Sequence, residues 1–288
     1  MNSGRPAVYV STAAAMWRRF RRNRLALAGL LIVGLLAAAA VFAPVLAPAD
    51  PSRQVLEDKR MSPGGKYWLG ADEFGRDITS RLMYGSRIAF VVGVASVLIA
   101  LAAGASLGTV AGFLGGYTDE LIMRALDVLL AFPYLLLAIA IVSALGPGLG
   151  NTILAVGIWA TPGFARVIRG SVLSIKEREY VQAARAVGAS TGRIVLRHIL
   201  PNCISIVIVY SALYMASAIL LEAALSFLGL GVQPPTPSWG LMVSTGRDFL
   251  VIAPHIATFP GLAIALAVLG FNLLGDGLRD ALDPKMRF

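Results

Sequence analysis

Three ionisable residues, Arg124, Asp127 and Glu222, lie within or beside long apolar stretches. A charged side chain inside a membrane-crossing helix costs about 2.5–3.5 kcal/mol, so it is expected to pair, to face water or to lose its charge. Arg124 and Asp127 are three residues apart and can neutralise each other along one helix face. Glu222 has no such neighbour, and the sequence leaves open whether it faces a cavity, meets a partner or is protonated. A role in a substrate or ion path is the chemistry that these residues could support.

Motifs for catalysis are missing from the sequence. Residues 64–66 (GGK) are followed by Tyr67 and lack the upstream glycine of a phosphate-binding loop, so we predict that the chain is not an enzyme and does not hydrolyse ATP. The two histidines, His198 and His255, lie far apart with no metal-ligand spacing around either. We therefore expect no catalytic residue, no metal and no cofactor bound by this chain.

The charged residues are distributed unevenly. The chain of 288 residues has 25 Lys or Arg and 16 Asp or Glu, and 57% of it is apolar, with a mean hydropathy of +0.74. More than half of the chain falls in windows without any charge: 25–49, 88–118, 128–165, 198–221, 223–246 and 249–275. A soluble fold needs charge on its exposed helices and loops, so we predict an all-α polytopic membrane protein. The net charge of +9 comes without a nucleic-acid-binding motif, and no nucleic-acid partner is expected.

A membrane-crossing helix needs about 20 mostly apolar residues. The sequence predicts six transmembrane helices, at 25–47, 88–114, 121–145, 151–169, 204–231 and 253–275. The basic N-terminus and first apolar run also resemble a secretory signal peptide. The run exceeds the 7–15 residues of a signal core, so we expect a retained helix.

Lys and Arg collect on one side of the expected helices. The N-terminal tail, the 115–124 turn, segment 166–201 and the C-terminal tail share that side and hold 17 of the 25 basic residues. The opposite side has segments 48–87 and 232–252. The positive-inside bias therefore predicts that both termini are cytoplasmic, where basic groups meet membrane lipid.

A row of glycines lies in the second expected helix. Gly104, Gly108 and Gly112 are spaced four residues apart, and Gly116 continues the row. Glycine lets another helix approach closely, so the row predicts helix packing. Whether it is a static contact or a sliding surface stays open.

Segment 166–201 is long for a loop, strongly basic and rich in helix formers. Small residues give its central part a flat face: Val181, Ala184, Ala186 and Val187. Gly188 is placed to stop this helix. Such a helix suits docking into a groove on another protein, and its arginines equally suit anionic lipid headgroups. Composition does not choose between them.

Residues 182–184 (QAA), Gly188 and residues 200–201 (LP) have the spacing of the EAA loop of bacterial ABC importer permeases, which this segment resembles. Two positions depart from that pattern, because Gln182 replaces the usual Glu and His198 the usual Ile. The lost carboxylate puts one charge contact to the ATPase in doubt, and Glu179, one turn earlier, is the candidate to replace it. The resemblance implies a set of ATPase-coupling residues: Glu179, Tyr180, Gln182, Ala183, Ala184, Gly188, Leu200 and Pro201.

Three further stretches resemble dipeptide and oligopeptide permeases of the DppC/OppC type. They are 68–87 (WLGADEFGRDITSRLMYGSR), 222–240 (EAALSFLGLGVQPPTPSWG) and 275–284 (GDGLRDALDP). With the arginine-rich opening, the resemblance covers nearly the whole chain. It implies a type I ABC importer permease core (MetI-like) of six transmembrane helices in the bacterial inner membrane. Residues 1–87 would form the tail, first helix and external segment, and 88–288 a five-helix core with its coupling loop at about 170–201.

The resemblance also implies a function and partners. The chain would form part of a translocation path for di- or oligopeptides, beside a homologous DppB/OppB-type permease. Two cytoplasmic ABC ATPase domains would bind ATP and Mg²⁺, and an extracytoplasmic substrate-binding protein would deliver the peptide. The alternative that the residues leave open is a stand-alone ion-coupled transporter or channel that uses Glu222, Asp127 and Arg124.

Overall fold

The computed structural model describes residues 12–282, so Arg5 in the basic tail and residues 283–284 of the last motif lie outside the described part. The described chain is helical, and its β-structure is limited to two isolated bridges. The elements are α1 (Thr12–Arg22), α2 (Arg24–Leu46), η1 (Leu56–Asp58), α3 (Ile78–Leu114), α4 (Gly116–Leu130), α5 (Tyr134–Leu145), α6 (Leu149–Lys176), α7 (Glu179–Ala186), α8 (Thr191–Ile194), η2 (Val195–Ile199), α9 (Leu200–Phe227), α10 (Trp239–Gly246), η3 (Arg247–Phe249) and α11 (His255–Leu282).

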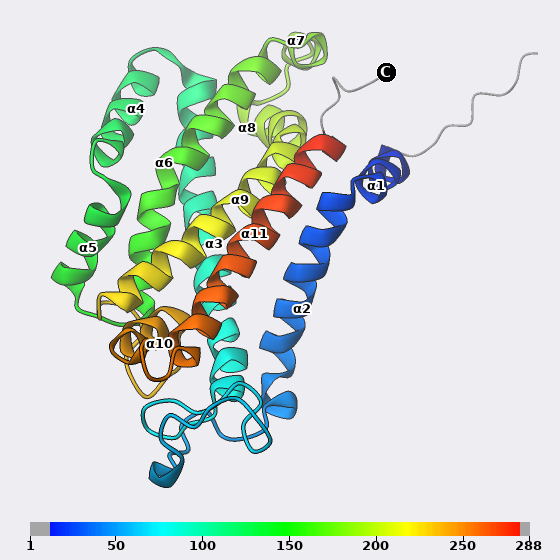
Figure 1. Ribbon diagram of the computed structural model, residues 1–288. Coiled ribbons are helices and arrows are strands. Elements are labelled where there is room, and N and C mark those ends of the chain that lie inside the picture. The colour runs from blue at the N-terminus through cyan, green and yellow to red at the C-terminus, as the bar shows by residue number, and fades with distance from the viewer. Residues whose placement is uncertain (1–11, 283–288) are drawn as a thin grey trace, which may run out of the picture.

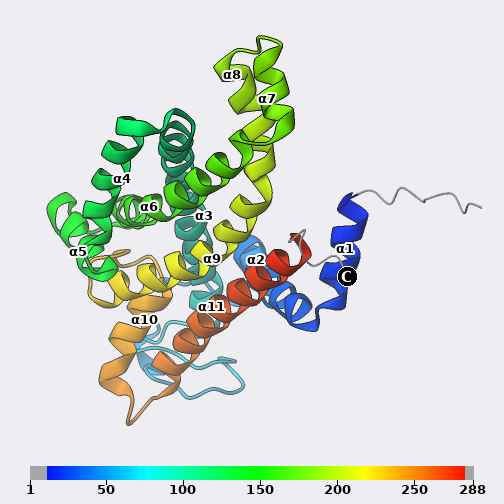
Figure 2. The same ribbon diagram turned by 90° about the horizontal axis from the view of Figure 1, so that it is seen from above.

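The helices form a bundle with two distinct ends (Figure 1). At the α7 end lie α1, α7, α8 and the last turns of α11. At the α10 end lie α10 and segment 47–77. The helices α2, α3, α6, α9 and α11 and the pair α4–α5 run between these ends. Seen along the bundle, α4 and α5 lie on one side and α1 on the other, with α3 and α9 between them (Figure 2).

Four helical stretches in residues 12–282 are long and apolar enough to cross a membrane: Arg24–Leu46, Ile78–Leu114, Thr191–Phe227 and His255–Leu282. They correspond to the helices expected at 25–47, 88–114, 204–231 and 253–275. The second begins ten residues before the expected start, because Asp77 caps it by accepting from the backbone N–H of Ser80 at 2.7 Å. The boundary expected between residues 87 and 88 therefore falls inside the continuous helix α3.

The prediction of one continuous helix over 121–145 is wrong. The chain forms α4 and α5, which meet at an angle of 89° and together could make a fifth crossing. Pro133 explains the break, since proline has no N–H to donate and disfavours helical geometry at Phe132 before it.

The helix expected at 151–169 is α6, which extends over 28 residues. Its glycines, threonines, Pro162, Arg166 and Arg169 lower its apolar content, and it is not among the stretches that qualify as spans. The prediction of six transmembrane helices is supported for α6 only by its position, because α6 lies alongside the helices that do qualify (Figure 1). Much of α6 is buried, and it packs along α3.

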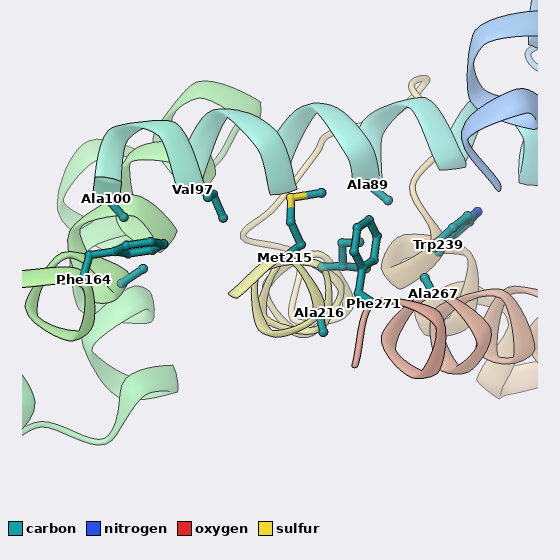
Figure 3. Packing of buried hydrophobic residues seen from close by; sticks show 11 residues of the cluster. Ala89, Val97, Ala100, Phe164, Met215, Ala216, Trp239, Ala267 and Phe271 are labelled. Carbon is teal, nitrogen blue, oxygen red and sulfur yellow. The ribbon is translucent and has the colours of Figure 1, made fainter. Parts of the chain in front are cut away.

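The main core lies between α3, α6, α9, α10 and α11 (Figure 3). Phe164 of α6, Met215 of α9 and Phe271 of α11 fill it, and alanines of α3 such as Ala89 and Ala100 let these side chains approach. Because lipid is as apolar as these residues, close packing rather than removal from water holds such helices together.

Candidate functional site

The coupling segment forms a short helix, α7, at the end of α6. A turn at Glu177 and Arg178 separates the two helices, and α7 ends at Ala186. The N–H of Gly188 bonds the carbonyl of Arg185 at 2.9 Å, and the N–H of Ala189 bonds that of Ala184 at 3.0 Å. This is a Schellman ending, and it requires the positive φ of 81° that glycine adopts readily. The prediction of a helix stopped by Gly188 is confirmed.

One side of α7 is fixed to the rest of the bundle. Val181 is fully buried in an apolar cluster with Ile175 of α6, Ile194 of α8 and Ile199 of η2. Ala184 packs against this cluster and is half-buried. A displacement of α7 must therefore carry the ends of α6 and α9 with it.

The opposite side of α7 is exposed and made mainly of small residues. Glu179, Gln182, Ala183, Ala186 and Val187 are exposed at the spacing of one helix face. This face differs from the predicted one, because Ala184 faces inward. Ala183 and Ala186 leave the backbone of α7 accessible to a close-fitting partner.

Gln182 has a structural role besides its exposure. Its Nε2 donates to the carbonyl of Lys176 at 3.3 Å, at the last residue of α6. Glutamate is the usual residue of the EAA pattern. When it is ionised, its carboxylate carries no proton and cannot donate to that carbonyl. The departure from the pattern thus helps to fix the turn between α6 and α7.

The remaining predicted coupling residues surround this helix. Tyr180 is 41% exposed, and its ring centroid lies 6.3 Å from that of His198 in η2. At the start of α9, Leu200 is half-buried and Pro201 exposed. These residues therefore gather at the α7 end.

The glycine row packs against α6. A β-carbon on Gly104 would lie 2.6 Å from Cβ of Phe164, and one on Gly112 would lie 3.0 Å from the carbonyl oxygen of Arg169. Gly116 stands apart, since it begins α4 and has nothing within 4 Å. The first three glycines thus set the distance between α3 and α6.

Glu222 is 1% exposed and lies in the last turns of α9, which ends at Phe227. The hydroxyl of Ser226 donates to its Oε1 at 2.7 Å and accepts from the N–H of Val232 at 3.2 Å. Of the three possibilities left open by the sequence, the structure gives Glu222 a polar partner. This partner links the carboxyl group to the loop that follows α9.

The predicted ion pair between Arg124 and Asp127 does not form. Arg124 pairs with Glu120 one turn earlier at 2.6 Å, and Asp127 pairs with Arg166 of α6 at 2.5 Å. Asp127 faces α6, so the cross-helix partner replaces the local one. Arg166 was missed as a site residue, although it ends a charge-free window inside an expected span.

A second ion pair joins the same two helices nearer the α7 end. Arg169 donates from Nε and a terminal nitrogen to both oxygens of Asp119, each at 2.5 Å. Their side chains are 34% and 15% exposed, whereas those of Arg166 and Asp127 are 53% and 54% exposed. The Arg169–Asp119 pair is therefore a covered clamp, whereas the Arg166–Asp127 pair is open on one side.

At the α10 end, an acidic and basic network orders the segment before α3. Asp72 accepts from Nε of Arg76 at 2.6 Å and lies 3.3 Å from Nε of Arg81. Glu73 pairs with Arg76 at 2.8 Å, and burial raises the pKa of its carboxyl group, with nearby Asp72 adding to the effect. These bonds give 68–77 a defined shape without a strand or long helix.

Two further contacts order the α10 end, one between α10 and α3 and one between this segment and α11. Nε1 of Trp239 in α10 donates to the carbonyl of Leu82 in α3 at 3.0 Å. Nε2 of His255, at the start of α11, lies 3.2 Å from the carbonyl oxygen of Ala71. His255 therefore has a structural partner, and no group of His, Cys, Asp or Glu within 12–282 is arranged to hold a metal ion.

Comparison with known proteins gives two family matches. Residues 104–288 match the binding-protein-dependent transport system inner membrane component family, and residues 11–63 match the N-terminal transmembrane domain of oligopeptide transport permease C. The chain is 48% identical over 272 residues to the glutathione transport system permease protein GsiD of Pectobacterium atrosepticum, covering 94% of this chain and 90% of that protein. It is 50% identical over the same shares to GsiD of Escherichia coli O157:H7. It is 46% identical over 280 residues to the dipeptide transport system permease protein DppC of Alkalihalophilus pseudofirmus, covering 96% of this chain and 92% of that protein.

Proposed function

Because the chain belongs to the family of binding-protein-dependent transport system inner membrane components, we propose that it acts as one permease subunit of an ATP-driven peptide importer and that α7 is its coupling helix. The observation that carries the coupling role is the two-sided character of α7. Val181 fixes one side to α6, α8 and η2, and the small residues Ala183 and Ala186 are exposed on the other. A rigid, accessible helix of this kind suits transmission of an ATPase movement into the bundle.

The proposed partners follow from this role. A homologous DppB/OppB-type permease completes the pathway, and two ABC ATPase domains bind and hydrolyse ATP with Mg²⁺, while this chain does not. A substrate-binding protein docks at the α10 end, where segment 68–77 and α10 supply an ordered surface. ATP-driven closure of the ATPases then pushes α7 and moves the ends of α6 and α9.

The orientation we propose puts the α7 end in the cytoplasm. α1, α7 and the end of α11 lie together there (Figure 1), and the basic residues of α1 include Arg18, Arg19, Arg21 and Arg22. The positive-inside bias supports this orientation, with α1 beside anionic headgroups. Both termini are then cytoplasmic in the multi-pass inner membrane protein.

Short peptides are the substrate class that we propose. The relatives are named for glutathione and for dipeptides, and both are short peptides with free carboxylate and ammonium groups. The division of the chain into 1–87 and a core of 88–288 remains part of the proposal. The core holds every residue of α7 and of the α4–α6 ion pairs.

The proposal is tested by purifying the tagged chain from its host membranes in mild detergent and identifying what co-purifies. We expect a second permease and ABC ATPases, with ATP hydrolysis stimulated by a peptide-loaded binding protein. Recovery of the chain alone, with peptide transport in liposomes that contain no ATPase, would overturn the proposal in favour of a stand-alone transporter.

A further inference from the structure

An ion pair within the helix bundle is open on one side. Asp127 lies about 16 Å along α4 from Gly116, and Arg166 lies about 15 Å before the end of α6 at Lys176. The two side chains meet at 2.5 Å and are each about half exposed, at 54% and 53%. The pair therefore lies about three helical turns in from the α7 end of the bundle, within the α4–α5 stretch that could cross the membrane.

Lipid is a poor neighbour for such a pair. Half-exposed charges at this depth retain their charge only beside water, protein or another charged group. The covered pair Arg169–Asp119 already clamps α4 to α6 through two hydrogen bonds. Holding the helices together therefore does not account for the Arg166–Asp127 pair. The open side of Arg166 and Asp127 must face an aqueous path or the second permease.

A row of aromatic residues extends from the same face of α6. Trp159 precedes Arg166 by seven residues, two helical turns, so both lie on one face. The ring centroid of Trp159 lies 5.7 Å from that of Tyr134 in α5 and 5.7 Å from that of Tyr214 in α9, and Tyr210 follows at 6.4 Å from Tyr214. The contacting helices α5, α6 and α9 thus share one aromatic surface.

These aromatic residues keep free polar groups. Tyr134 is 50% exposed, and Trp159, Tyr210 and Tyr214 are half-buried. The phenol of Tyr214 lies over Gly163, where a β-carbon would be 1.6 Å from its oxygen. None of the hydrogen bonds found within 12–282 involves the phenol oxygens of these tyrosines. Tyrosines at this depth normally find a partner for the hydroxyl, so these are available to a ligand.

We propose that Arg166, Asp127 and the aromatic row of Tyr134, Trp159, Tyr210 and Tyr214 form the peptide-contacting wall of this subunit. The inference rests on the proposed function and deepens it. When the path is empty, Arg166 and Asp127 neutralise each other. When a peptide passes, Arg166 binds its carboxylate and Asp127 binds its ammonium group, while the rings pack against its side chains.

The chemistry of the pair suits this exchange. Arg166 gives one hydrogen bond to Asp127, which leaves further guanidinium donors for a carboxylate. Trp159 and Arg166 are separated by about 10 Å along α6, and an extended peptide spans about 3.3–3.6 Å per residue. An extended peptide of about three residues therefore reaches from the ion pair to the aromatic row.

Thiol labelling tests whether water reaches this wall in the assembled importer. The buried Cys203 is the only cysteine of the chain, so a Cys203→Ser background is free of thiols from this subunit. We expect Tyr134→Cys to react at least about tenfold faster with a charged thiol reagent than Leu35→Cys, which is 63% exposed on α2, because thiolates form in water and not in lipid. Saturating transported peptide should slow the first reaction only. Equal rates, or no protection by peptide, would overturn the proposal.

Charge variants test the role of the pair itself. We expect Arg166→Gln and Asp127→Asn each to lower peptide uptake by roughly tenfold or more, as loss of a charge-assisted hydrogen bond would. The exchanged variant Arg166→Asp/Asp127→Arg restores an ion pair but reverses its polarity, so uptake should stay low. Normal uptake by that double variant would reduce the pair to a structural clamp and overturn the inference.

The two proposals fail in different ways. Co-purification of the ATPases with each charge variant keeps the importer assignment intact, whatever uptake shows. Loss of uptake counts for the wall only where the ATPases still co-purify and still hydrolyse ATP. A variant that fails to assemble is replaced by Arg166→Lys, which keeps the charge, loses the planar fork and should also reduce uptake; full uptake by that variant counts against the carboxylate contact.

Discussion

A β-carbon on Gly108 of α3 would lie 2.3 Å from the carbonyl oxygen of Ala165 in α6. No real side chain fits at that distance, so the absence of a side chain at Gly108 sets how closely the two helices approach. The helices α3 and α6 together form the centre of the bundle. α3 begins at the α10 end, and α6 leads into α7 at the opposite end.

We predict that Gly108→Val destabilises the protein by about 1–3 kcal/mol, since the extra carbons must push α3 away from α6. Thermal unfolding in detergent measures the loss as a lower Tm. The matched control is Gly170→Val in α6, where a β-carbon meets nothing within 4 Å. Similar Tm values for the two variants would contradict a close contact at Gly108.

Substitution of the exposed face of α7 should release the ATPases. We predict that Ala183→Trp abolishes ATPase co-purification without affecting membrane insertion, because its bulk stands on the exposed face. Ala184 is a poorer probe, since it packs on the inner side of α7. The matched control, Ala102→Trp on the exposed side of α3, should retain the ATPases. Normal ATPase recovery with Ala183→Trp would exclude this face as the docking surface.

Glu222 should tolerate an amide better than a truncation. Glu222→Gln keeps an oxygen that accepts from Ser226, whereas Glu222→Ala leaves that buried hydroxyl with one partner fewer. We predict a loss of about 1–3 kcal/mol for the alanine variant and a much smaller one for the glutamine variant, both measured as Tm in detergent. A stable alanine variant that no longer transports peptide would move Glu222 from a structural role to the path.

Segment 47–77 at the α10 end should loosen in acid. Hydrogen bonds from Lys66 and from Tyr67 lower the pKa of Asp58 below its ordinary value of 3.8. A carboxyl group with a lowered pKa stabilises the fold above its ordinary pKa and loses that contribution as the pH falls from about 3.8 through the lowered value. The protection of amides in 55–67 against hydrogen exchange, relative to their intrinsic exchange rates, should therefore fall in this window. The variant Asp58→Asn should remove the pH dependence, and an unchanged profile would show that another group controls it.

Much of the fold follows from the sequence because lipid imposes strong rules. Apolar length predicts α2, α3, α9 and α11 to within about ten residues at each end, and Gly188 marks the stop after α7. Pro133 is present in the sequence, but the apolar residues on either side of it led to the prediction of one helix over 121–145. Hydropathy alone does not register that a proline removes a donor from a helix.

Contacts between helices were harder to predict than the helices themselves. Asp127 has both Arg124 and Arg166 within reach in principle, and only the placement of α4 against α6 selects the second. For the same reason, the inward direction of Ala184 depends on where Val181 meets its cluster. Sequence spacing gives the neighbours along one helix, whereas partners from another helix depend on packing.

Peptide uptake into liposomes that contain the purified complex of this chain tests whether ATPases drive transport through α7. We expect uptake that requires ATP in the compartment facing the ATPases and a peptide-loaded binding protein on the opposite side, and we expect it to be lost in the Ala183→Trp complex. Uptake by this chain without ATP, ATPases or binding protein would contradict this expectation.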